Sequence, residues 1–442
     1  MTEYTPHDGF LPRLGPENWL ATGSAKLQIP VGHRASGTSG SDRHFLLVTA
    51  PFGPFSRHLA AALRDEGARC SRVLLNGGDL IDWGVRDAAV YRGDADAWPS
   101  WIRAHLIGED VTDLVTHGDS NPYATSAMRE AHRLGVRVHV FEEGYLRPHW
   151  ITLERDGVNA HSSLPRNPEY YVRAHSAAAS RRPVEISGIG PAAVSNISLY
   201  HFLAFALGPL FARYKSPYAH SPPRQATGHV RRLAAQVLQR RRRTEALTRI
   251  IDAPGPLFLA LLQRPGDSQL VRHSRFGGCD SFIDCVVDSF GAHAPANARL
   301  LIKSHPLDHG LEPHARDVAA AAARAGVADR VFFTDDGCFL SLVRRADGIV
   351  SVNSTAGLAT LELGRPTLAL GQAIYDLPGL THQSGLDTFW SVPEAPDRDL
   401  FEAFRAVVAA RTQVNGAFST RRGIALAAPE AARRLLAATG ET

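Results

Sequence analysis

The sequence predicts an α/β protein built from two Rossmann-like, doubly wound domains with a cleft between them. At 442 residues the chain is longer than a single hydrophobic core usually supports. Short apolar strands alternate with helical stretches in both halves, which favours parallel sheets with helices on both faces. Hydrophobic residues make up 44% of the chain and charged residues 21%, as in an ordinary globular protein.

The first predicted domain covers residues 43–195. It follows a leader, residues 1–42, whose Gly, Pro, Ser and charged residues indicate a flexible segment. A turn rich in Gly and Pro after the first strand precedes an amphipathic helix over 57–66. Because the carboxyl ends of parallel strands meet at one edge of a sheet, we expect the polar residues after these strands to lie together. The predicted strands are 45–49, 72–75, 113–116 and 137–141.

A connecting region over residues 196–250 is predicted to be helical and basic. The stretch 197–211 is apolar and aromatic at near-helical spacing, and Lys215 and the run Arg240–Arg243 follow it. An apolar segment beside a basic helix is typical of a surface that binds anionic lipid headgroups. A pair of inter-domain helices with a solvated basic face fits the same residues, so both interpretations stay open.

The second predicted domain covers residues 251–398, and helices over 399–442 are expected to close the molecule. Its apolar strands again alternate with helical stretches. Two similar doubly wound sheets with a cleft between them are the arrangement of many sugar-nucleotide transferases. The predicted strands are 256–262, 298–302, 331–333, 347–352 and 367–370.

Two strand ends of the second domain form a candidate phosphate site. A strand that ends at small hydroxyl residues and restarts as a helix presents free backbone N–H groups, which attract an anion together with the helix dipole. An ordinary helix cap and plain surface charge are the alternatives. The residues are Lys303, His305 and Pro306 after strand 298–302, and Asn353, Ser354 and Thr355 after strand 347–352.

A pair of adjacent acids, Glu142 and Glu143, follows the strand 137–141. Like charges held together raise the pKa of one of them, which suits a group that gives or takes a proton. Acidic pairs also occur on plain surfaces, which is the alternative here. Gly144 comes next and is expected to allow a sharp turn, and Arg147 is a candidate partner for an acidic substrate group.

The net charge of +4 and the pI near 9.0 favour an anionic substrate or membrane surface, and they are too small to indicate nucleic acid. The four cysteines lack metal-ligand spacing and are expected to be reduced thiols of a cytoplasmic protein. The N-terminus shows no export signal, and no apolar run has the length of about 20 residues that a bilayer requires. No metal or other cofactor is expected.

Several motifs occur in one order over roughly residues 45–416, and through them the chain resembles the capsule biosynthesis proteins of the KpsS/LipB type, which are Kdo transferases. The acidic-acidic-Gly, His-Pro and Ser-Thr elements are also similar to those of bacterial sialyltransferases. The motifs are Pro51–Phe55, Asn76–Asp79, Val140–Pro148, Ile151–Glu154, Gly157–Asn159, Gln263 with Asp267 and Gln269, His273–Ser274, His305–Pro306, Asn353–Thr355, Leu380 with Phe389–Trp390, and Gln413 with Asn415–Gly416.

The resemblance implies a GT-B glycosyltransferase that takes the acidic sugar Kdo from CMP-Kdo, with the acceptor on the first domain and the nucleotide sugar on the second. It would place the first β-linked Kdo, with retention of configuration, on a lysophosphatidylglycerol anchor at the inner face of the cytoplasmic membrane. The implied location is the cytoplasm with peripheral attachment to the inner membrane, and the implied partners include other capsule assembly and export proteins. No nucleic acid partner is expected.

The resemblance also implies roles for individual residues. Asp267 is expected to be the carboxylate beside the oxocarbenium-like sugar, and Glu143 with Glu142 to handle the proton of the acceptor hydroxyl; the reverse assignment stays open, as does a capping role for Asp267. Residues expected to bind CMP are Lys303, His305, Pro306, Asn353, Ser354 and Thr355. Residues expected to bind the sugar or the acceptor are Asp119, Arg147, Gln263, Arg264, Gln269, Arg272 and His273.

Two segments depart from the family pattern. Ser120–Tyr123 follows Gly118-Asp119 where an Arg and a nearby His are usual, which suggests a different acceptor. The sequence Arg-Pro-Gly between Gln263 and Asp267 is also unusual and is expected to reshape that loop. Two other functions remain open. One is a non-catalytic export or scaffold protein that binds lipid-linked polysaccharide, and the other is a transferase that uses a different CMP- or UDP-sugar. Paired acids that face a nucleotide site would favour an enzyme over a scaffold.

Overall fold

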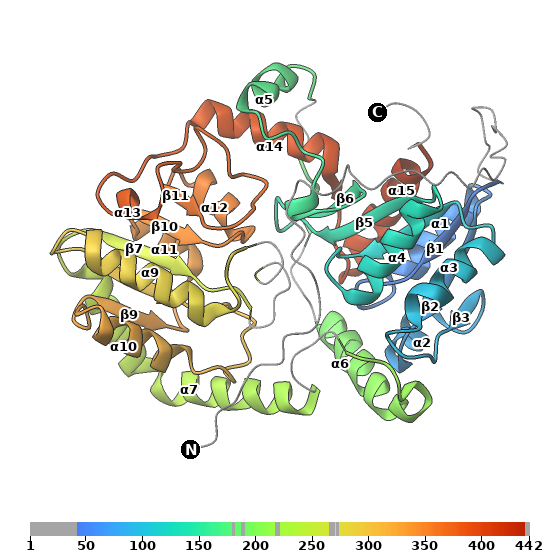
Figure 1. The fold of residues 1–442 in the computed structure, drawn as a ribbon, viewed down its shortest axis with the longest axis horizontal. Coiled ribbons are helices and arrows are strands. Elements are labelled where there is room, and N and C mark those ends of the chain that lie inside the picture. The colour runs from blue at the N-terminus through green and yellow to red at the C-terminus, as the bar shows by residue number, and fades with distance from the viewer. Residues whose placement is uncertain are drawn as a thin grey trace, which may run out of the picture. The chain divides into compact units, whose positions relative to one another are not determined.

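The computed structural model describes residues 42–178, 182–186, 191–216, 222–264, 270 and 274–437. Within these residues the chain forms two β-sheets, each covered by helices (Figure 1). The predicted leader lies outside the described residues except for its last position. Four predicted site residues, Asp267, Gln269, Arg272 and His273, also lie outside them.

The first sheet has seven strands in the order β12-β6-β5-β4-β1-β2-β3. The first five strands in the chain are parallel, and four of them were predicted. Strands β6 and β12 extend the sheet in antiparallel register, which the alternation of strands and helices did not predict. The strands are β1 (His44–Leu47), β2 (Arg69–Leu74), β3 (Ala88–Val90), β4 (Asp113–His117), β5 (Arg137–Glu143), β6 (Trp150–Arg155) and β12 (Gln413–Asn415).

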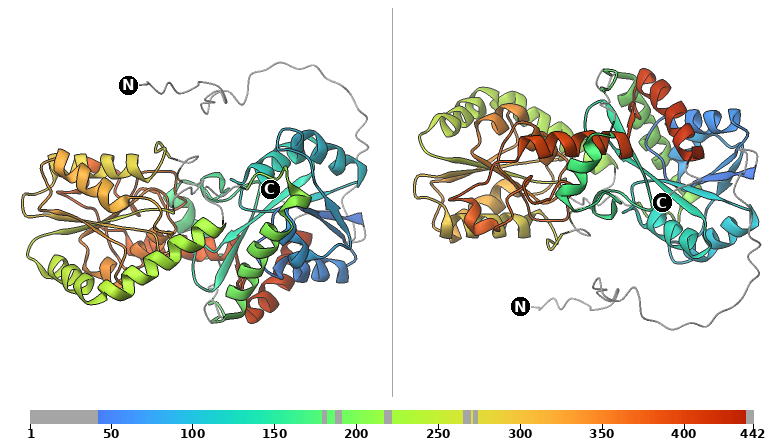
Figure 2. Two further views of the ribbon diagram at one scale, coloured as in Figure 1. Left: turned by 90° about the horizontal axis from the view of Figure 1, so that it is seen from below. Right: turned by 90° about the horizontal axis from the view of Figure 1, so that it is seen from above.

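Helices cover both faces of the first sheet because its strands are apolar on both sides. In β1, Phe45 and Leu47 pack with α1 and α15, whereas Leu46 packs with α3 and α4 on the opposite face. Figure 2 shows these helix pairs on opposite sides of the sheet. The helices are α1 (Phe55–Asp65), α2 (Gly77–Trp83), α3 (Trp98–Gly108), α4 (Pro122–Arg133) and α15 (Arg421–Ala437).

The second sheet has five parallel strands in the order β11-β10-β7-β8-β9. Its apolar core lies mainly between the sheet and α9 and α10, and a smaller cluster lies on the face covered by α11 and the end of α7. The strands are β7 (Leu257–Leu261), β8 (Arg299–Lys303), β9 (Val331–Thr334), β10 (Gly348–Ser351) and β11 (Thr367–Ala369). The helices are α9 (Cys279–His293), α10 (His314–Arg324), α11 (Phe339–Arg345), α12 (Ala356–Glu362) and α13 (Leu386–Phe389).

Both sheets share the Rossmann order of parallel strands. Counted within each domain, the five parallel strands run 5-4-1-2-3, so the strand order reverses between β1 and β4 in the first sheet and between β7 and β10 in the second. In open α/β sheets, ligands bind beyond the carboxyl ends of the strands at this reversal. The fold therefore directs attention to the loops after β7 and β10.

The remaining helices connect the two sheets. Helix α14 packs on α5, and the chain then returns to the first sheet as β12. These connecting elements are the short helix η2 (Asn159–His161), α5 (Pro168–His175), α6 (Pro191–Ala206), the short helix η3 (Gly208–Phe211), α7 (Pro222–Asp252) and α14 (Arg398–Thr412).

Candidate active site

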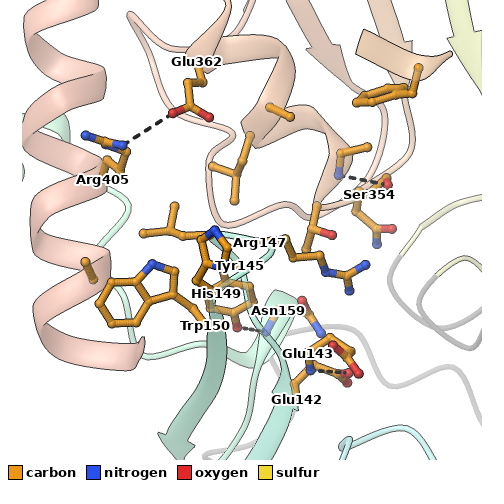
Figure 3. Close-up of a pocket in the computed structure, with 18 of the residues that line it drawn as sticks. Glu142, Glu143, Tyr145, Arg147, His149, Trp150, Asn159, Ser354, Glu362 and Arg405 are labelled. Atoms are coloured by element: carbon orange, nitrogen blue, oxygen red, sulfur yellow. Dashed lines mark hydrogen bonds and ion pairs between the residues drawn. The ribbon is translucent and has the colours of Figure 1, made fainter. Parts of the chain in front are cut away.

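A cavity of about 1030 Å³ lies where the carboxyl ends of strands from both sheets face each other (Figure 3). This volume suits a nucleotide-sized ligand. Ten of the predicted site residues line it, and they come from both domains. They are Glu142, Glu143, Arg147, Gln263, Lys303, His305, Pro306, Asn353, Ser354 and Thr355.

Lys303 is the last residue of β8 and is buried, with 6% of its surface exposed, so the alternative of plain surface charge is wrong. Its ammonium donates a hydrogen bond to the carbonyl oxygen of Asp336 at 3.1 Å. Burial and the nearby charge of Arg232 lower the pKa of Lys303, while Asp335 and Asp336 act in the opposite direction. A cation held in this way is pre-positioned for an anion in the cavity.

His305 follows Lys303 by two positions and presents one ring nitrogen for a ligand. Its Nδ1 accepts a hydrogen bond from the backbone N–H of Leu307 at 3.0 Å, so in the neutral ring the proton resides on Nε2. Burial, followed by the charges of Arg264 and Arg147, lowers the pKa of His305 to about 4. His305 is therefore a neutral N–H donor near neutral pH, and a bound anion would raise its pKa.

The loop after β10 supplies the opposite wall of the second domain's half of the cavity. Gln263, just after β7, donates from Nε2 to Oδ1 of Asn353 at 2.7 Å, which joins the two loops at the strand reversal. The Oγ of Ser354 accepts the N–H of Ala356 at 3.2 Å, so Ser354 serves as a local turn residue while it also lines the cavity. The capping and binding interpretations of this segment are therefore compatible.

The predicted acid pair lies at the end of β5, on the side of the cavity formed by the first domain (Figure 3). Glu142 is half-buried and accepts the backbone N–H of Glu143 at 2.9 Å through Oε1, while Glu143 is exposed. Gly144 was expected to allow a sharp turn, and the chain does reverse after it, between the antiparallel strands β5 and β6; Gly144 also permits close packing. A Cβ at Gly144 would lie 2.1 Å from the carbonyl oxygen of Trp150 on the paired strand β6.

Arg147 extends into the space between the acid pair and Ser354 (Figure 3). Its Nε donates to the carbonyl oxygen of Gly144 at 3.3 Å, which holds the base of the side chain. After burial and Arg264, the charge of Arg147 contributes to the lowered pKa of His305, although these two residues belong to different domains. Arg147 and His305 both line the cavity, so one ligand can contact both.

Tyr145 anchors the segment that carries Arg147. Its hydroxyl donates to Oε1 of Glu154 at 2.6 Å and accepts the N–H of Asn159 at 2.6 Å. Ser162 donates to the other oxygen of Glu154 at 2.5 Å. Burial raises the pKa of both Tyr145 and Glu154. The family motifs around residues 151–159 thus serve to support the acid pair and Arg147.

Asp119 was predicted to bind the sugar or the acceptor, but it is buried and is not among the described residues that line the cavity. Its Oδ2 accepts the N–H of Val158 at 3.2 Å and lies 3.0 Å from Nδ1 of His161. The neighbouring Ser120 lines the cavity instead. A buried carboxylate that holds the segment around Val158 and His161 has a positioning role.

Arg264 was also predicted to contact the sugar, and it lies beside the cavity. Its Nη2 is 3.1 Å from Nε2 of His309. In addition to burial, its charge contributes to the lowered pKa of His305, His201 and His229, so its guanidinium group lies within a cluster of imidazoles from three parts of the chain. An anionic ligand would relieve this concentration of positive charge.

Sequence reasoning missed residues that reach the cavity from helices α12 and α14. Arg405 of α14 pairs with Glu362 of α12 at 3.4 Å, and both line the cavity (Figure 3).

Gln413 was also not predicted as a site residue, although it belongs to a family motif. Its Oε1 accepts the N–H of Tyr145 at 3.0 Å, which fixes the segment that carries Arg147. Its place in a family motif with Asn415 and Gly416 was the signal that could have found it.

The described part of the chain contains neither a candidate metal site nor a candidate membrane span. No group of three or more His, Cys, Asp or Glu residues there is placed to hold a metal ion. Among the described helices, none is both long enough and apolar enough to cross a bilayer.

Two Rossmann-like domains that share one cavity define a GT-B-like protein. The model of the family described as capsule polysaccharide biosynthesis protein matches residues 112–419, more than half of the chain. The chain therefore belongs to this capsule polysaccharide biosynthesis family, as the motifs predicted.

Curated relatives extend the match over most of the chain. A capsule polysaccharide export protein of Escherichia coli, KpsS, is 32% identical over 86% of this chain and 97% of its own length. A capsule polysaccharide modification protein of Neisseria meningitidis serogroup A, LipB, is 33% identical over 86% of this chain and 92% of its own length. Among solved structures, the β-Kdo 2,7 transferase of Thermosulfurimonas dismutans KpsC is 12% identical, with a TM-score of 0.43 over 90% of this chain and all of that chain.

Proposed function

We propose that this protein is a retaining β-Kdo transferase that uses CMP-Kdo to start a poly-Kdo linker on a phosphatidylglycerol or lysophosphatidylglycerol anchor in capsule biosynthesis. The observation that carries the proposal is the single cavity lined by Glu142, Glu143 and Arg147 of one domain and by Lys303 and His305 of the other. The family of the chain and the resemblance of its motifs support the choice of sugar and acceptor.

The donor phosphate would lie against the second domain. When the bond between the sugar and the phosphate breaks, its electron pair stays on the phosphate oxygen of CMP, and the added negative charge needs donors. Lys303, the Nε2–H of His305 and the loop at Ser354 and Thr355 can supply them. The neutral ring of His305 would donate its Nε2–H to the leaving phosphate, while Nδ1 keeps its hydrogen bond from Leu307.

The Kdo carboxylate would meet arginine. Arg147 extends into the cavity, and Arg264 lies close to His305 beside it. A guanidinium group binds a carboxylate through two parallel hydrogen bonds and so fixes the orientation of the sugar. These two arginines, together with Gln263, are the sugar-binding residues we propose from the described part of the chain, and Arg272 remains a candidate from the sequence.

The acceptor hydroxyl would attack the anomeric carbon while its proton passes to Glu143, with Glu142 in support. Retention requires a carboxylate beside the anomeric carbon, either as a nucleophile or as an ion-pair partner. Asp267, six positions after the end of β7, is the candidate from the sequence, and the reverse assignment of the acids remains open. No metal is included, because Lys303, His305 and backbone amides can neutralise a monophosphate.

A lipid acceptor would place the working protein at the inner face of the cytoplasmic membrane. Peripheral attachment there, with other capsule assembly and export proteins as partners, is part of the proposal. The basic character of the chain, with a net charge of +4, supports contact with an anionic membrane surface.

The test is to incubate the protein with CMP-Kdo and a fluorescent lysophosphatidylglycerol and to measure CMP release and the mass of the lipid. Release of CMP together with a mass gain of one Kdo supports the proposal. Turnover with another CMP- or UDP-sugar but not with CMP-Kdo would replace the donor. Binding of lipid-linked saccharide without any release of CMP would favour the non-catalytic export or scaffold role.

A further inference from the structure

Helices α6 and α7 carry exposed apolar side chains beside arginines, and we propose that they form a docking surface for an anionic lipid bilayer. This α6–α7 surface consists of the outer faces of α6, η3 and α7. Both helices lie along the lower margin of Figure 1, α6 beside the first sheet and α7 beside the second. The proposal deepens the proposed membrane attachment by naming its surface, and its test is independent of the reaction because no sugar donor is present.

The inner face of α6 is fixed to helix α2. A Cβ at Gly77 would lie 2.4 Å from the carbonyl oxygen of Leu203. One at Gly78 would lie 2.7 Å from the ring of Tyr200, so two glycines permit the close contact. The Tyr200 hydroxyl accepts a hydrogen bond from Nδ2 of Asn76 at 2.9 Å. This explains the Asn-Gly-Gly motif and determines which face of α6 is turned outward.

The outer face of α6 exposes large apolar side chains. Phe202 and Phe205 are 62% and 66% exposed, and they follow Tyr200 by two and five positions, which places them on the opposite side of the helix. Leu210, in η3, is 52% exposed. Aromatic side chains gathered on an exposed face indicate an interaction surface rather than ordinary scattered exposure.

Helix α7 has a similar arrangement over residues 230–237. Arg232 donates to the carbonyl oxygen of Pro306 at 3.2 Å, and Arg243 pairs with Asp335, so one face of the helix is bound to the second domain. The side turned away from that domain exposes a stripe of apolar residues. An amphipathic helix with an apolar outer stripe and flanking arginines is suited to the bilayer interface. The stripe consists of Val230, Leu233 and Val237, which are 68%, 62% and 68% exposed.

The positive charge of this region favours binding to an anionic surface. Between Pro191 and Thr244 the sequence contains eight arginines and one lysine but no Asp or Glu. Each cation near an anionic membrane adds attraction. A second copy of the chain is disfavoured, because a symmetric interface would bring the same basic faces together. The occupant that fits both the apolar residues and the charge is a bilayer that contains anionic lipid.

The α6–α7 surface adjoins the cavity through both helices. His201 of α6 packs against Phe52 with ring centroids 5.1 Å apart, and burial, followed by the charge of Arg264, lowers the pKa of His201. His229 of α7 packs against His309 at 4.7 Å, and His309 contacts Arg264. Arg232 of α7 donates to Pro306, which lines the cavity, so the inner face of α7 reaches the cavity wall. A bilayer on the outer face of α7 would be separated from that wall by the helix itself.

The experiment is co-sedimentation of the full chain with two kinds of vesicle, one of phosphatidylcholine alone and one of phosphatidylcholine and phosphatidylglycerol in equal parts. We expect binding to the second kind, weakened by salt because exposed charges are screened. The double variant F202S/F205S should bind at least about tenfold more weakly, since it removes two inserted rings. The triple variant R240Q/R241Q/R242Q should bind roughly 100-fold more weakly, at about 1 kcal/mol per cation.

The matched controls substitute the same types of residue at exposed positions outside the α6–α7 surface. Ile107 of α3 and Val392 after α13 are 58% and 68% exposed, and I107S/V392S should leave vesicle binding unchanged. Arg421, Arg422 and Arg433 of α15 are exposed, and R421Q/R422Q/R433Q, which removes the same number of cations, should weaken vesicle binding much less. Circular dichroism and thermal unfolding show that each variant is folded.

Three results would overturn the proposal. The first is that the wild-type chain does not bind vesicles that contain phosphatidylglycerol. The second is that the wild type and the α6–α7 variants bind these vesicles equally well. The third is that light scattering shows a dimer, and that F202S/F205S dissociates the dimer but still binds vesicles. A chain that binds vesicles as expected but transfers no Kdo would refute the proposed reaction and leave this surface standing.

Discussion

Gln413 and Tyr145 are 268 positions apart, and the Gln413 side-chain oxygen accepts the Tyr145 backbone N–H at 3.0 Å. Gln413 begins β12, the strand that returns from the second domain to pair with β6. Its Nε2 donates to Oγ1 of Thr152 at 3.0 Å, so one buried side chain connects the C-terminal strand to the segment that carries Arg147. The geometry of the cavity thus depends on a residue that does not line it.

The substitution Gln413→Ala should destabilise the protein by about 1–3 kcal/mol, because it leaves buried partners without a hydrogen bond. We also expect a lower kcat, since the segment that carries Arg147 loses its support. Urea unfolding and the CMP-release assay measure the two effects. Gln239→Ala, a change of an exposed residue of α7, is the control. An unchanged kcat at full saturation would show that Gln413 serves stability alone.

The substitution Glu143→Gln should lower kcat by about 10²–10⁴-fold if Glu143 takes the proton of the acceptor. CMP affinity should stay unchanged, because the nucleotide would lie against the second domain. Glu142→Gln is the matched comparison and tests which of the two acids acts. A wild-type rate in both variants would remove the acid pair from the mechanism.

The affinity for CMP should depend on pH through His305. The pKa of this residue is about 4 in the free protein, so it is neutral above that value, and a bound anion raises its pKa. Binding therefore takes up a proton, and affinity rises as the pH falls from neutral toward that pKa. Calorimetry in buffers of different ionisation enthalpy measures the proton uptake.

In His305→Asn this proton uptake should disappear, while titration of the CMP phosphate, common to both proteins, remains. The difference between the two pH profiles therefore isolates His305. Identical profiles would mean that the imidazole does not contact the nucleotide.

The substitution Gly144→Ala should disturb the site more than its size suggests. The new methyl group would lie 2.1 Å from the carbonyl oxygen of Trp150, so β5 and β6 must separate locally. We expect reduced thermal stability and reduced activity. Gly108→Ala is the control, because a Cβ there meets nothing within 4 Å, and the change should be neutral or slightly stabilising. Normal activity in Gly144→Ala would show that the pairing of these strands is more adaptable than the contact indicates.

The substitution Asp113→Asn should lower the stability of the fold without affecting ligand binding in the cavity. Asp113 starts β4, at the end of the strand away from the cavity. Burial would raise the pKa of its carboxyl, but hydrogen bonds with His139, Arg137 and Arg43 outweigh burial and hold this pKa below the usual value. Removing this charge should cost about 3–5 kcal/mol in urea unfolding, because the arginines around it lose their partner.

Asp87→Asn, which breaks the exposed pair with Arg64, should cost about 1 kcal/mol or less. CMP affinity should be unchanged in both folded variants. A similar cost for the two substitutions would show that the cluster around Asp113 is better solvated than its burial indicates.

Local patterns in the sequence were enough to predict many of the elements. The strand 298–302 was predicted from a short, mostly apolar run, and the structure has β8 at Arg299–Lys303 with every residue buried. Polar residues at strand ends were enough to predict that the loops after β8 and β10 line one cavity, because parallel strands share one direction and place their ends at one edge. The family followed from motifs in a fixed order.

Relationships that join distant parts of the chain became visible only in three dimensions. No local pattern shows that β6 and β12 pair in antiparallel register, that the carbonyl of Trp150 requires Gly144, or that Asp119 is buried and holds the segment around Val158. Each of these follows from which chain segments pack together. The hydrophobic pattern and the turn residues determine whether a segment is a helix or a strand and which of its faces is apolar. Contacts between residues hundreds of positions apart determine which segments pack against it. The sequence determines these contacts too, but they cannot be read from a local stretch of residues.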